Sequence, residues 1–297
     1  MQHTPVLLHE TIDGLTLEPG FTVVDATLGL GGHSAAILEK IGSHGVLVGI
    51  ELDHNARTHA EKRLENYAAT KHLIQGSFVE LNQILRTLNI DSVHAVLFDL
   101  GWNSSQLEAG RGFSFMKDEP LLMTLRSDID EDTITAAHVV NTWSTKDLRE
   151  TIGTLGEESF AGRIAEAIVA ERKNGPIETS GRLAEIVESA VPVWYRNKKT
   201  HPATKTFQAL RIVVNDELSS ITTGVQAAFE RLAPKGRIAI ITFHSLEDGL
   251  VKRLFKSLEK EHNAHIITKK PITPTREETQ SNPRARSAKL RIIEKHA

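Results

Sequence analysis

The chain of 297 residues contains no cysteine. This absence excludes disulfide bonds and any metal site built on thiolates, and it fits a reducing compartment. No basic segment followed by an apolar one opens the sequence, so we expect no export. Apolar runs such as Val46–Val48 are far shorter than the roughly 20 residues of a membrane-spanning helix. We therefore expect a cytoplasmic protein without a membrane segment.

A large excess of charge of either sign is also missing. The net charge of -3 argues against a protein that coats nucleic acid indiscriminately. The positive charges are nonetheless concentrated in two zones. Five Lys and Arg and no acid lie in residues 191–215, and eight Lys and Arg with three Glu lie in residues 269–297. Both zones suit local contact with phosphates, although a solvated loop and a basic tail would give the same pattern.

The order of apolar segments predicts an α/β fold. Length and a composition of 40% hydrophobic and 25% charged residues indicate a globular chain of about two domains. Strand-like segments at 21–25, 45–50, 72–75, 93–99 and 237–243 alternate with helical patterns in both terminal regions. Such alternation implies a parallel sheet covered by helices.

Between these regions the pattern is helical, and no segment is a convincing strand. We therefore predict a Rossmann-like parallel sheet interrupted by an all-helical insert. The predicted boundaries are 1–104 for the first part of the sheet domain, 105–206 for the insert, and 207–297 for the second part with its basic tail.

A glycine-rich loop, residues 29–33, follows the first predicted strand. Glycines at this turn let the backbone approach a ligand, and the N–H groups of the next helix point towards it. A nicotinamide fingerprint would place its third glycine at position 34, which is Ser34. Asp25 followed by Gly29-x-Gly31 is instead common in methyltransferases that bind S-adenosylmethionine. A purely structural turn would use glycine as well.

The second strand ends at Glu51, twenty residues after Gly31. A carboxylate at this position can accept hydrogen bonds from both ribose hydroxyls of a nucleoside cofactor. Asp53 is a rival for this role, and an ordinary acid at a strand end is the simpler alternative. Together with the glycine loop, Glu51 favours a cofactor site.

Several further motifs occur in an order that resembles the RsmH (MraW) family, from residue 3 to about residue 292. They are His3–Leu8, Thr27–His33, Phe98–Gln106, Arg111–Phe115, Gly156–Glu158, His201–Ala203, Phe207–Arg211, Phe243–Asp248 and Asn282–Ser287. Members of that family are bacterial methyltransferases that modify the exocyclic N4 of a cytidine in the decoding region of small-subunit (16S) ribosomal RNA.

The resemblance implies that the predicted sheet is of the class I methyltransferase type. It also implies S-adenosylmethionine as the cofactor and 16S rRNA within the small ribosomal subunit as the partner. The implied cofactor residues are Gly29, Gly31, Gly32, His33, Glu51, Phe78, Asp99 and Gln106. Phe78 would lie beside the adenine, and Asp99 near the methionine amine and the mouth of the reaction site. The helical insert would help to recognise RNA. The oligomeric state stays open, with a dimer as one option.

Some positions depart from the family pattern. Glu51 stands where the family usually has Asp, which keeps the carboxylate and lengthens its reach. Substrate-side departures are Trp102, Asn103, Leu122, Thr124 and Gly249. A noncatalytic RNA-binding assembly factor that retains the fold is therefore the main alternative. An amino-methylating DNA enzyme is disfavoured because Asp99 is not followed by a proline pair and an aromatic residue.

The expected chemistry is a direct in-line methyl transfer, since a cytosine amino group is a weak nucleophile and a sulfonium methyl a strong electrophile. Asp99 and Asn103 are candidate acceptors for an amino hydrogen. Asp99 could equally bind the cofactor amine. His244 follows the fifth strand and could accept a proton, although a structural histidine is at least as good an interpretation.

A base in folded RNA must be unstacked before it can enter such a site. The candidate RNA-binding residues are Arg111, Arg196, Lys198, Lys199, Lys205, Arg211, Arg284 and Arg286. Trp102 and Trp194 could stack on bases or pack in the core. No His-Glu-x-x-His motif is present, and we expect no metal requirement.

Overall fold

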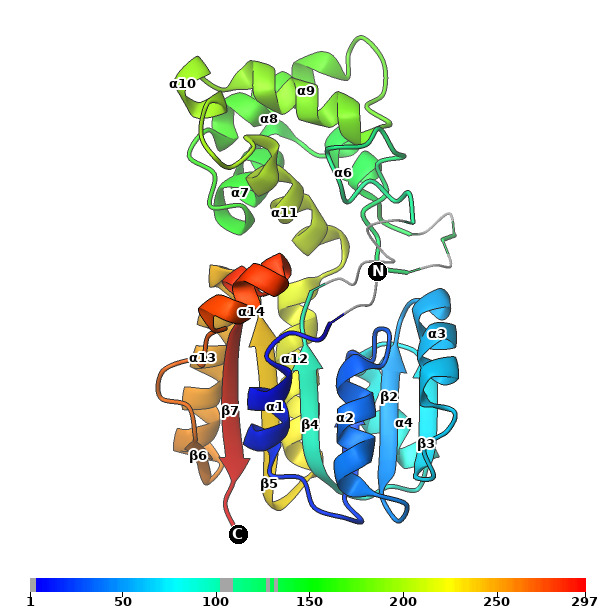
Figure 1. Cartoon of the computed structure of the whole chain (residues 1–297). Coiled ribbons are helices and arrows are strands. Elements are labelled where there is room, and N and C mark those ends of the chain that lie inside the picture. The colour runs from blue at the N-terminus through cyan, green and yellow to red at the C-terminus, as the bar shows by residue number, and fades with distance from the viewer. Residues whose placement is uncertain (1–3, 102–108, 127–128, 131–132) are drawn as a thin grey trace. The chain divides into compact units, whose positions relative to one another are not determined.

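The computed structural model describes residues 4–101, 109–126, 129–130 and 133–297. The chain forms two compact units (Figure 1). The sheet unit comprises Met1–Gly101 and Leu218–Ala297, and the helical unit comprises Trp102–Glu217. The expected interruption of a sheet domain by a helical insert is thus present.

The sheet unit contains seven strands in the order β3-β2-β1-β4-β5-β7-β6. Their bounds are β1 Thr22–Asp25, β2 Val46–Glu51, β3 Thr70–Gln75, β4 Val93–Asp99, β5 Leu232–Thr242, β6 Ala264–Ile266 and β7 Lys289–Lys295. Strands β1 to β5 are parallel, and β7 runs antiparallel to both β5 and β6. The predicted Rossmann-like sheet of class I methyltransferases is confirmed, with two strands added at one edge.

Strand β7 lies in the region that we predicted to be a basic tail. Leu290, Ile292 and Ile293 are buried in the sheet. Arg291 is also buried, and its Nε lies 2.7 Å from Oδ1 of Asp248. The positive charge of the segment is thus partly neutralised within the fold, so its local charge was a poor guide to its structure.

Helices cover both faces of the sheet (Figure 1). One face packs against α4 Leu81–Thr87, α12 Glu217–Arg231 and α13 Ser245–Glu261, and the other against α1 Leu8–Leu15, α2 Gly32–Ile41 and α3 His54–Leu64. Neighbouring strand residues alternate between the two cores: Val24 belongs to the first and Val23 to the second. This alternation is the period of two that a strand imposes.

The carboxyl ends of three adjacent strands carry acids. β1 ends at Asp25, β2 at Glu51 and β4 at Asp99. In the sheet, β2 and β3 lie on one side of β1, whereas β4 and β5 lie on its other side. Ligands of open α/β sheets bind at such a reversal of strand order, outside the carboxyl ends. The topology therefore points to this edge as the ligand site.

Three short segments complete the sheet unit. The 3-10 helix η1 Phe78–Glu80 follows β3, and the helix α14 Arg276–Ser281 and the 3-10 helix η2 Pro283–Ser287 precede β7. Glu278 of α14 accepts a hydrogen bond from the backbone N of Leu7 at 2.7 Å. Asn282 donates its side-chain amide to the Thr4 carbonyl at 3.1 Å. The segment before α1 is thereby held by the last part of the chain.

The helical unit has its own apolar core. Its described residues form the helices α6 Ala136–Thr142, α7 Thr145–Leu155, α8 Ala161–Glu171, α9 Ser180–Ala190, α10 Val193–Arg196 and α11 Ala203–Val214. The insert extends beyond the expected boundary at 206 because Phe207 and Leu210 of α11 pack into this core. Among the helices that the structure describes, none has the length and apolarity required to span a bilayer.

We expect Ile293→Ala to lower the free energy of unfolding by about 2–5 kcal/mol, because it removes a buried side chain at the centre of the added sheet edge. Chemical denaturation measures this change. His296→Ala alters an exposed residue just beyond β7 and serves as the control. A negligible effect of Ile293→Ala would contradict the placement of β7 in the folded sheet.

Candidate active site

The loop after β1 has the backbone geometry that its glycines permit. Gly29 and Gly31 adopt φ angles of 51° and 75°, in the left-handed region that favours glycine. A Cβ on Gly32 would lie 2.5 Å from Cγ of Pro5. The loop therefore turns sharply into α2 under close cover from the segment before α1.

Glu51 is the central anchor of this loop. Its Oε2 accepts a hydrogen bond from the backbone N of Gly29 at 2.8 Å, and its Oε1 accepts one from the backbone N of Asp53 at 2.9 Å. Each carboxylate oxygen has a second lone pair, so the group can still receive two hydroxyl donors. Burial raises the pKa of Glu51 to about 7, against the opposing effect of these two N–H groups.

Asp53, the other candidate to bind the ribose hydroxyls, instead has a structural role. Its side chain accepts hydrogen bonds from the backbone N of Asn55 and of Ala56, at 2.9 and 3.2 Å. It thus forms the N-cap of α3. Glu51 is the better candidate for the ribose hydroxyls.

Two polar residues that are not among the predicted site residues, Thr27 and Ser34, connect the end of β1 to β4 and α2. Ser34 donates its hydroxyl to Oδ2 of Asp25 at 2.6 Å. Thr27 accepts a hydrogen bond from the backbone N of Asp99 at 2.6 Å through its Oγ1. Burial raises the pKa of Asp25 to about 6. Ser34, which stands where the nicotinamide fingerprint requires glycine, therefore donates a hydrogen bond to the buried carboxyl group at the end of β1.

His33 and Asp99 form a pair whose protonation the geometry restricts. Nε2 of His33 lies 3.0 Å from the carbonyl oxygen of Val6, which can only accept, so Nε2 carries a proton. Nδ1 of His33 lies 3.5 Å from Oδ2 of Asp99. In the neutral ring this Nδ1 presents a lone pair to the carboxyl group. The contact is favourable only when a further proton resides on Nδ1 or on Oδ2.

Among Asp25, Glu51 and Asp99, the pKa of Asp99 is raised the most. Burial raises its pKa to about 8, and the negative charges of Asp25 and Glu247 add to the rise. Its side chain retains 21% exposure. Its Oδ1 is buried and has no hydrogen-bond partner among the described residues. Asp99 can therefore bind a cationic or hydrogen-donating ligand at this edge.

Phe78 follows β3 and begins η1, which Ser77 caps. Its ring meets Phe98 of β4 edge-on, with centroids 5.4 Å apart. Gly224 of α12 lies so close that an added Cβ would approach the Phe78 ring to 2.5 Å. The ring is half-buried and held on two sides. Such a ring can provide an apolar contact for a planar base.

His244 forms the N-cap of α13. Its Nδ1 accepts a hydrogen bond from the backbone N of Glu247 at 3.4 Å, and Glu247 accepts one from the backbone N of Phe243 at 2.7 Å. This capping box occupies the Nδ1 lone pair. Nε2 lies 3.1 Å from Oε1 of Glu247, but the two groups lack hydrogen-bond geometry. The arrangement supports the structural interpretation of His244.

Comparison with known proteins identifies the family. Residues 1–296 match the model of the MraW methylase family. The chain belongs to this family. It is 44% identical to Ribosomal RNA small subunit methyltransferase H of Syntrophus aciditrophicus (strain SB), over 99% of this chain and 97% of that protein. It is 43% identical to the protein of the same name from Clostridium botulinum (strain Kyoto / Type A2), over 99% of both.

Among solved structures, an rRNA methylase from Streptococcus thermophilus aligns over 100% of both chains, with a TM-score of 0.49 and 13% identity.

The predicted cofactor residues of this MraW methylase family member meet at one edge of the sheet unit. The structure brings together Gly29, Gly31, Gly32, His33, Glu51, Phe78 and Asp99 on the loops and ends of β1 to β4. Gln106 and Asn103, and the departure Trp102, lie outside the described residues.

The predicted RNA-binding residues of the helical unit fall into two groups. Arg196, Lys198 and Lys199 are exposed. Arg111 and Arg211 are only 7% and 6% exposed. Arg111 donates to the carbonyls of three residues, Thr124 to Arg126, and Arg211 forms a double hydrogen bond with Glu217 at 2.7 and 2.8 Å. These two arginines organise the helical unit.

The three remaining candidates for RNA binding are Lys205, Arg284 and Arg286. Lys205 donates to the carbonyl of Glu157 at 2.6 Å. Arg284 and Arg286 are exposed on η2 of the sheet unit.

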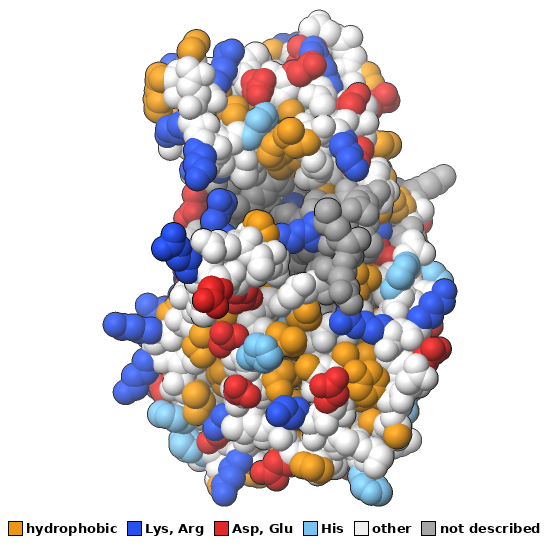
Figure 2. Space-filling model, in the orientation of Figure 1, with side chains coloured by type: hydrophobic (Ala, Val, Ile, Leu, Met, Phe, Trp, Pro, Cys, Tyr) orange, Lys and Arg blue, Asp and Glu red, His pale blue; other side chains and the backbone are white. Residues whose placement is uncertain are grey.

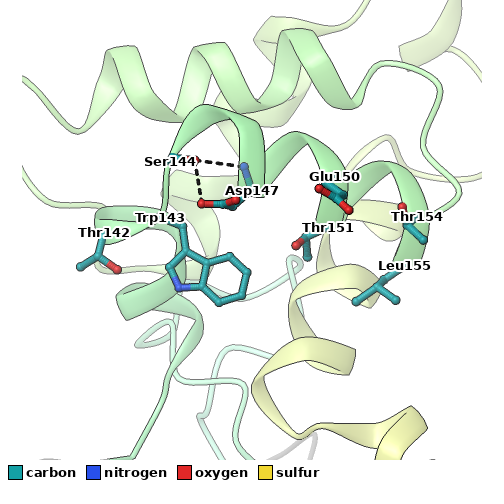
Figure 3. A pocket seen from close by; sticks show the side chains of 8 residues that line it. All are labelled: Thr142, Trp143, Ser144, Asp147, Glu150, Thr151, Thr154 and Leu155. Atoms are coloured by element: carbon teal, nitrogen blue, oxygen red, sulfur yellow. Dashed lines mark hydrogen bonds between the residues drawn. The ribbon is translucent and has the colours of Figure 1, made fainter.

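A separate hollow of about 700 Å³ lies in the helical unit (Figure 3). It is lined by Thr142, Trp143, Ser144, Asp147, Glu150, Thr151, Thr154 and Leu155. Ser144 binds Asp147 there, by donating its hydroxyl at 2.7 Å and accepting the backbone N at 3.1 Å. Two carboxyl groups on the wall make this hollow unsuited to phosphates.

The raised pKa of Asp99 has a consequence for stability. The native state holds a proton that the unfolded state releases above the ordinary pKa of 3.8, so stability falls as the pH rises from about 4 through about 8. We expect the thermal midpoint of the ligand-free protein to be several degrees lower at about pH 8.5 than at about pH 5.5. Asp99→Asn should reduce this difference.

Asp248→Asn is the matched control. The ion pairs with Arg291 and Lys289 lower the pKa of Asp248, so its ionisation is complete below this pH window. The variant should lose stability at both pH values and keep the wild-type difference between them. An unchanged pH dependence in Asp99→Asn would show that Asp99 is ionised in the ligand-free protein.

Proposed function

We propose that the chain uses S-adenosylmethionine to methylate the exocyclic N4 of a cytidine in the decoding region of 16S ribosomal RNA, in the cytoplasm. The observation that carries this proposal is the placement of Glu51 and Asp99 on either side of the 29–33 loop, at the reversal of strand order. The relatives' name, Ribosomal RNA small subunit methyltransferase H, supports the substrate class.

The site fits this cofactor because its donors and acceptors are complementary. Glu51 has two free lone pairs for the ribose hydroxyls, and the half-buried Phe78 ring suits the adenine. The buried Oδ1 of Asp99 has no hydrogen-bond partner among the described residues and would accept from the methionine amine or from the base. When bound, S-adenosylmethionine supplies a methyl group activated by a positively charged sulfur.

Asp99 acts best as a hydrogen-bond acceptor when it is ionised. In the ligand-free site its pKa of about 8 keeps it largely protonated near neutral pH. A cation in the site favours the carboxylate and lowers this pKa. Asp99 can then accept a hydrogen from the exocyclic amine, which localises the nitrogen lone pair for in-line attack. Loading of the cofactor site thus prepares Asp99 for the substrate.

His33 supports Asp99 in this role. Its Nε2–H is tied to the Val6 carbonyl, so its Nδ1 is the nitrogen that faces Asp99. A proton released from Oδ2 of Asp99 can be held at that Nδ1. His244 is less suited to accept a proton, because its Nδ1 already accepts the N–H of Glu247. We therefore assign the proton-holding role to the His33–Asp99 pair.

RNA contact in this proposal rests on the exposed basic residues. Arg196, Lys198 and Lys199 of the helical unit, and Arg284 and Arg286 of the sheet unit, can reach phosphates. The two buried arginines of the helical unit are left out because their guanidinium groups are engaged inside it.

We expect Glu51→Gln to weaken binding of S-adenosylmethionine about tenfold or more. The substitution turns one oxygen into an NH₂ group, which then faces a backbone N–H of Gly29 or Asp53 and can no longer accept from a ribose hydroxyl. Isothermal calorimetry with the cofactor and its demethylated product measures the change. Glu51→Asp keeps the carboxylate and should bind within a few-fold of wild type. Equal affinity in Glu51→Gln would remove Glu51 from the site.

Methyl transfer from labelled cofactor to 30S particles and to free 16S rRNA, with nuclease mapping of the product, tests the reaction itself. We expect label on the N4 of one cytidine, and a loss of about 10²-fold or more in Asp99→Ala. Full activity in Asp99→Ala would exclude Asp99 from the mechanism. RNA binding by the wild type without any transfer would instead favour the noncatalytic assembly factor.

A further inference from the structure

The short helix α10 places an aromatic side chain on the surface. Trp194 is 61% exposed and its neighbour Val193 is 67% exposed. Over α10, Figure 2 shows hydrophobic side chains at the surface with Lys and Arg side chains nearby. Core packing, one of the two interpretations of Trp194 from sequence, does not describe this position. An exposed indole is available to a ligand.

Other aromatic side chains hold the indole in place. The ring of Trp194 meets Phe160 and Tyr195 near-edge-on, with centroids 5.9 and 5.7 Å away. Tyr195 is buried, and its hydroxyl donates to Oε2 of Glu158 at 2.6 Å. Edge-on neighbours restrict the orientation of the indole without stacking on its faces. The ring is thus prepared for stacking at a low entropic cost.

Basic side chains lie close to this aromatic cluster. Nζ of Lys198 lies 5.0 Å from the Trp194 ring centroid and 4.5 Å from that of Tyr195. Arg163 lies over the Phe160 ring at 5.8 Å. Glu158, which accepts the hydrogen bond from the Tyr195 hydroxyl, is buried, whereas Lys198 and Arg163 are exposed. The electrostatic surroundings therefore suit an anionic ligand with a flat apolar part.

We propose that Trp194 is a stacking platform for an unpaired base of RNA, with Lys198 contacting the adjoining phosphate. The choice of RNA rests on the proposed function. An indole can stack on a base only when the face of that base is open, so unpaired nucleotides fit and duplex RNA does not. A second copy of this chain fits poorly, because it would bring two sets of like charges together.

Binding of a short fluorescent single-stranded RNA, followed by anisotropy, tests the platform. We expect Trp194→Ala to weaken binding about tenfold, Trp194→Phe to retain most of the affinity, and Val193→Ala to match wild type. The same strand annealed to its complement should show no dependence on Trp194. Equal affinity of Trp194→Ala and wild type for the single strand would overturn the proposal.

Salt dependence separates the two residues. Lys198→Ala should reduce the slope of log affinity against log salt by about 0.7, the value for one phosphate of a single strand, whereas Trp194→Ala should leave it unchanged. Stacking also predicts quenching of indole fluorescence by RNA. The chain has three tryptophans, so the difference between wild type and Trp194→Phe isolates Trp194. No quenching in that difference would count against the platform.

These measurements also distinguish failure of the platform from failure of the proposed function. Wild-type methylation of 16S rRNA with unimpaired RNA binding by Trp194→Ala would overturn the platform alone. Loss of single-strand binding in Trp194→Ala, in a protein that transfers no methyl group to rRNA, would support the platform and overturn the proposed function. Self-association that depends on Trp194 would replace the platform with an interface between copies. The helical content measured by circular dichroism should be unchanged in every variant, which verifies folding of the helical unit.

Discussion

The carboxyl edge of the sheet depends on one carboxylate that holds two backbone segments together. Glu51 accepts the N–H of Gly29 from the glycine loop and the N–H of Asp53 from the start of α3. These two bonds fix the loop after β1 against the end of β2, where neither segment has regular structure of its own. They also offset part of the cost of burying the acid. The shape of the ligand site follows from this bridge.

The same edge is electrostatically unfavourable without a ligand. Burial raises the pKa values of Asp25, Glu51 and Asp99 to about 6, 7 and 8, and the negative charge of Asp25 adds to the rise at Glu51 and Asp99. A group of carboxyls kept partly neutral by its surroundings is a prepared site for a cation, because the cation restores the charged form. If the edge binds the proposed cofactor, stability of the ligand-free sheet unit is exchanged for affinity, as is common at functional sites.

The parts of the fold and site that could be predicted are those encoded in short stretches of sequence. Apolar runs predicted β1, β2 and β4, and the acids that end these strands indicated the edge where we propose that the ligand binds. β7 was missed because its charged residues suggested a solvated tail, whereas Arg291 is neutralised by Asp248. The bond from Asp99 to Thr27 joins residues 72 positions apart and depends on β1 and β4 being neighbours. Burial of Arg111 likewise depends on a chain reversal that no local pattern shows.

The residues that we assign to the cofactor and those that we assign to RNA stacking lie in different units of the chain. Every described residue that we assign to the cofactor lies in the sheet unit, and the aromatic surface around Trp194 lies in the helical unit. The helical unit begins at Trp102, three residues after Asp99, so it is joined covalently to the strand that carries the proposed acceptor. Its core is independent of the sheet. Changes on its surface can therefore alter which RNA is bound while the hydrogen bonds around Glu51 and Asp99 stay intact.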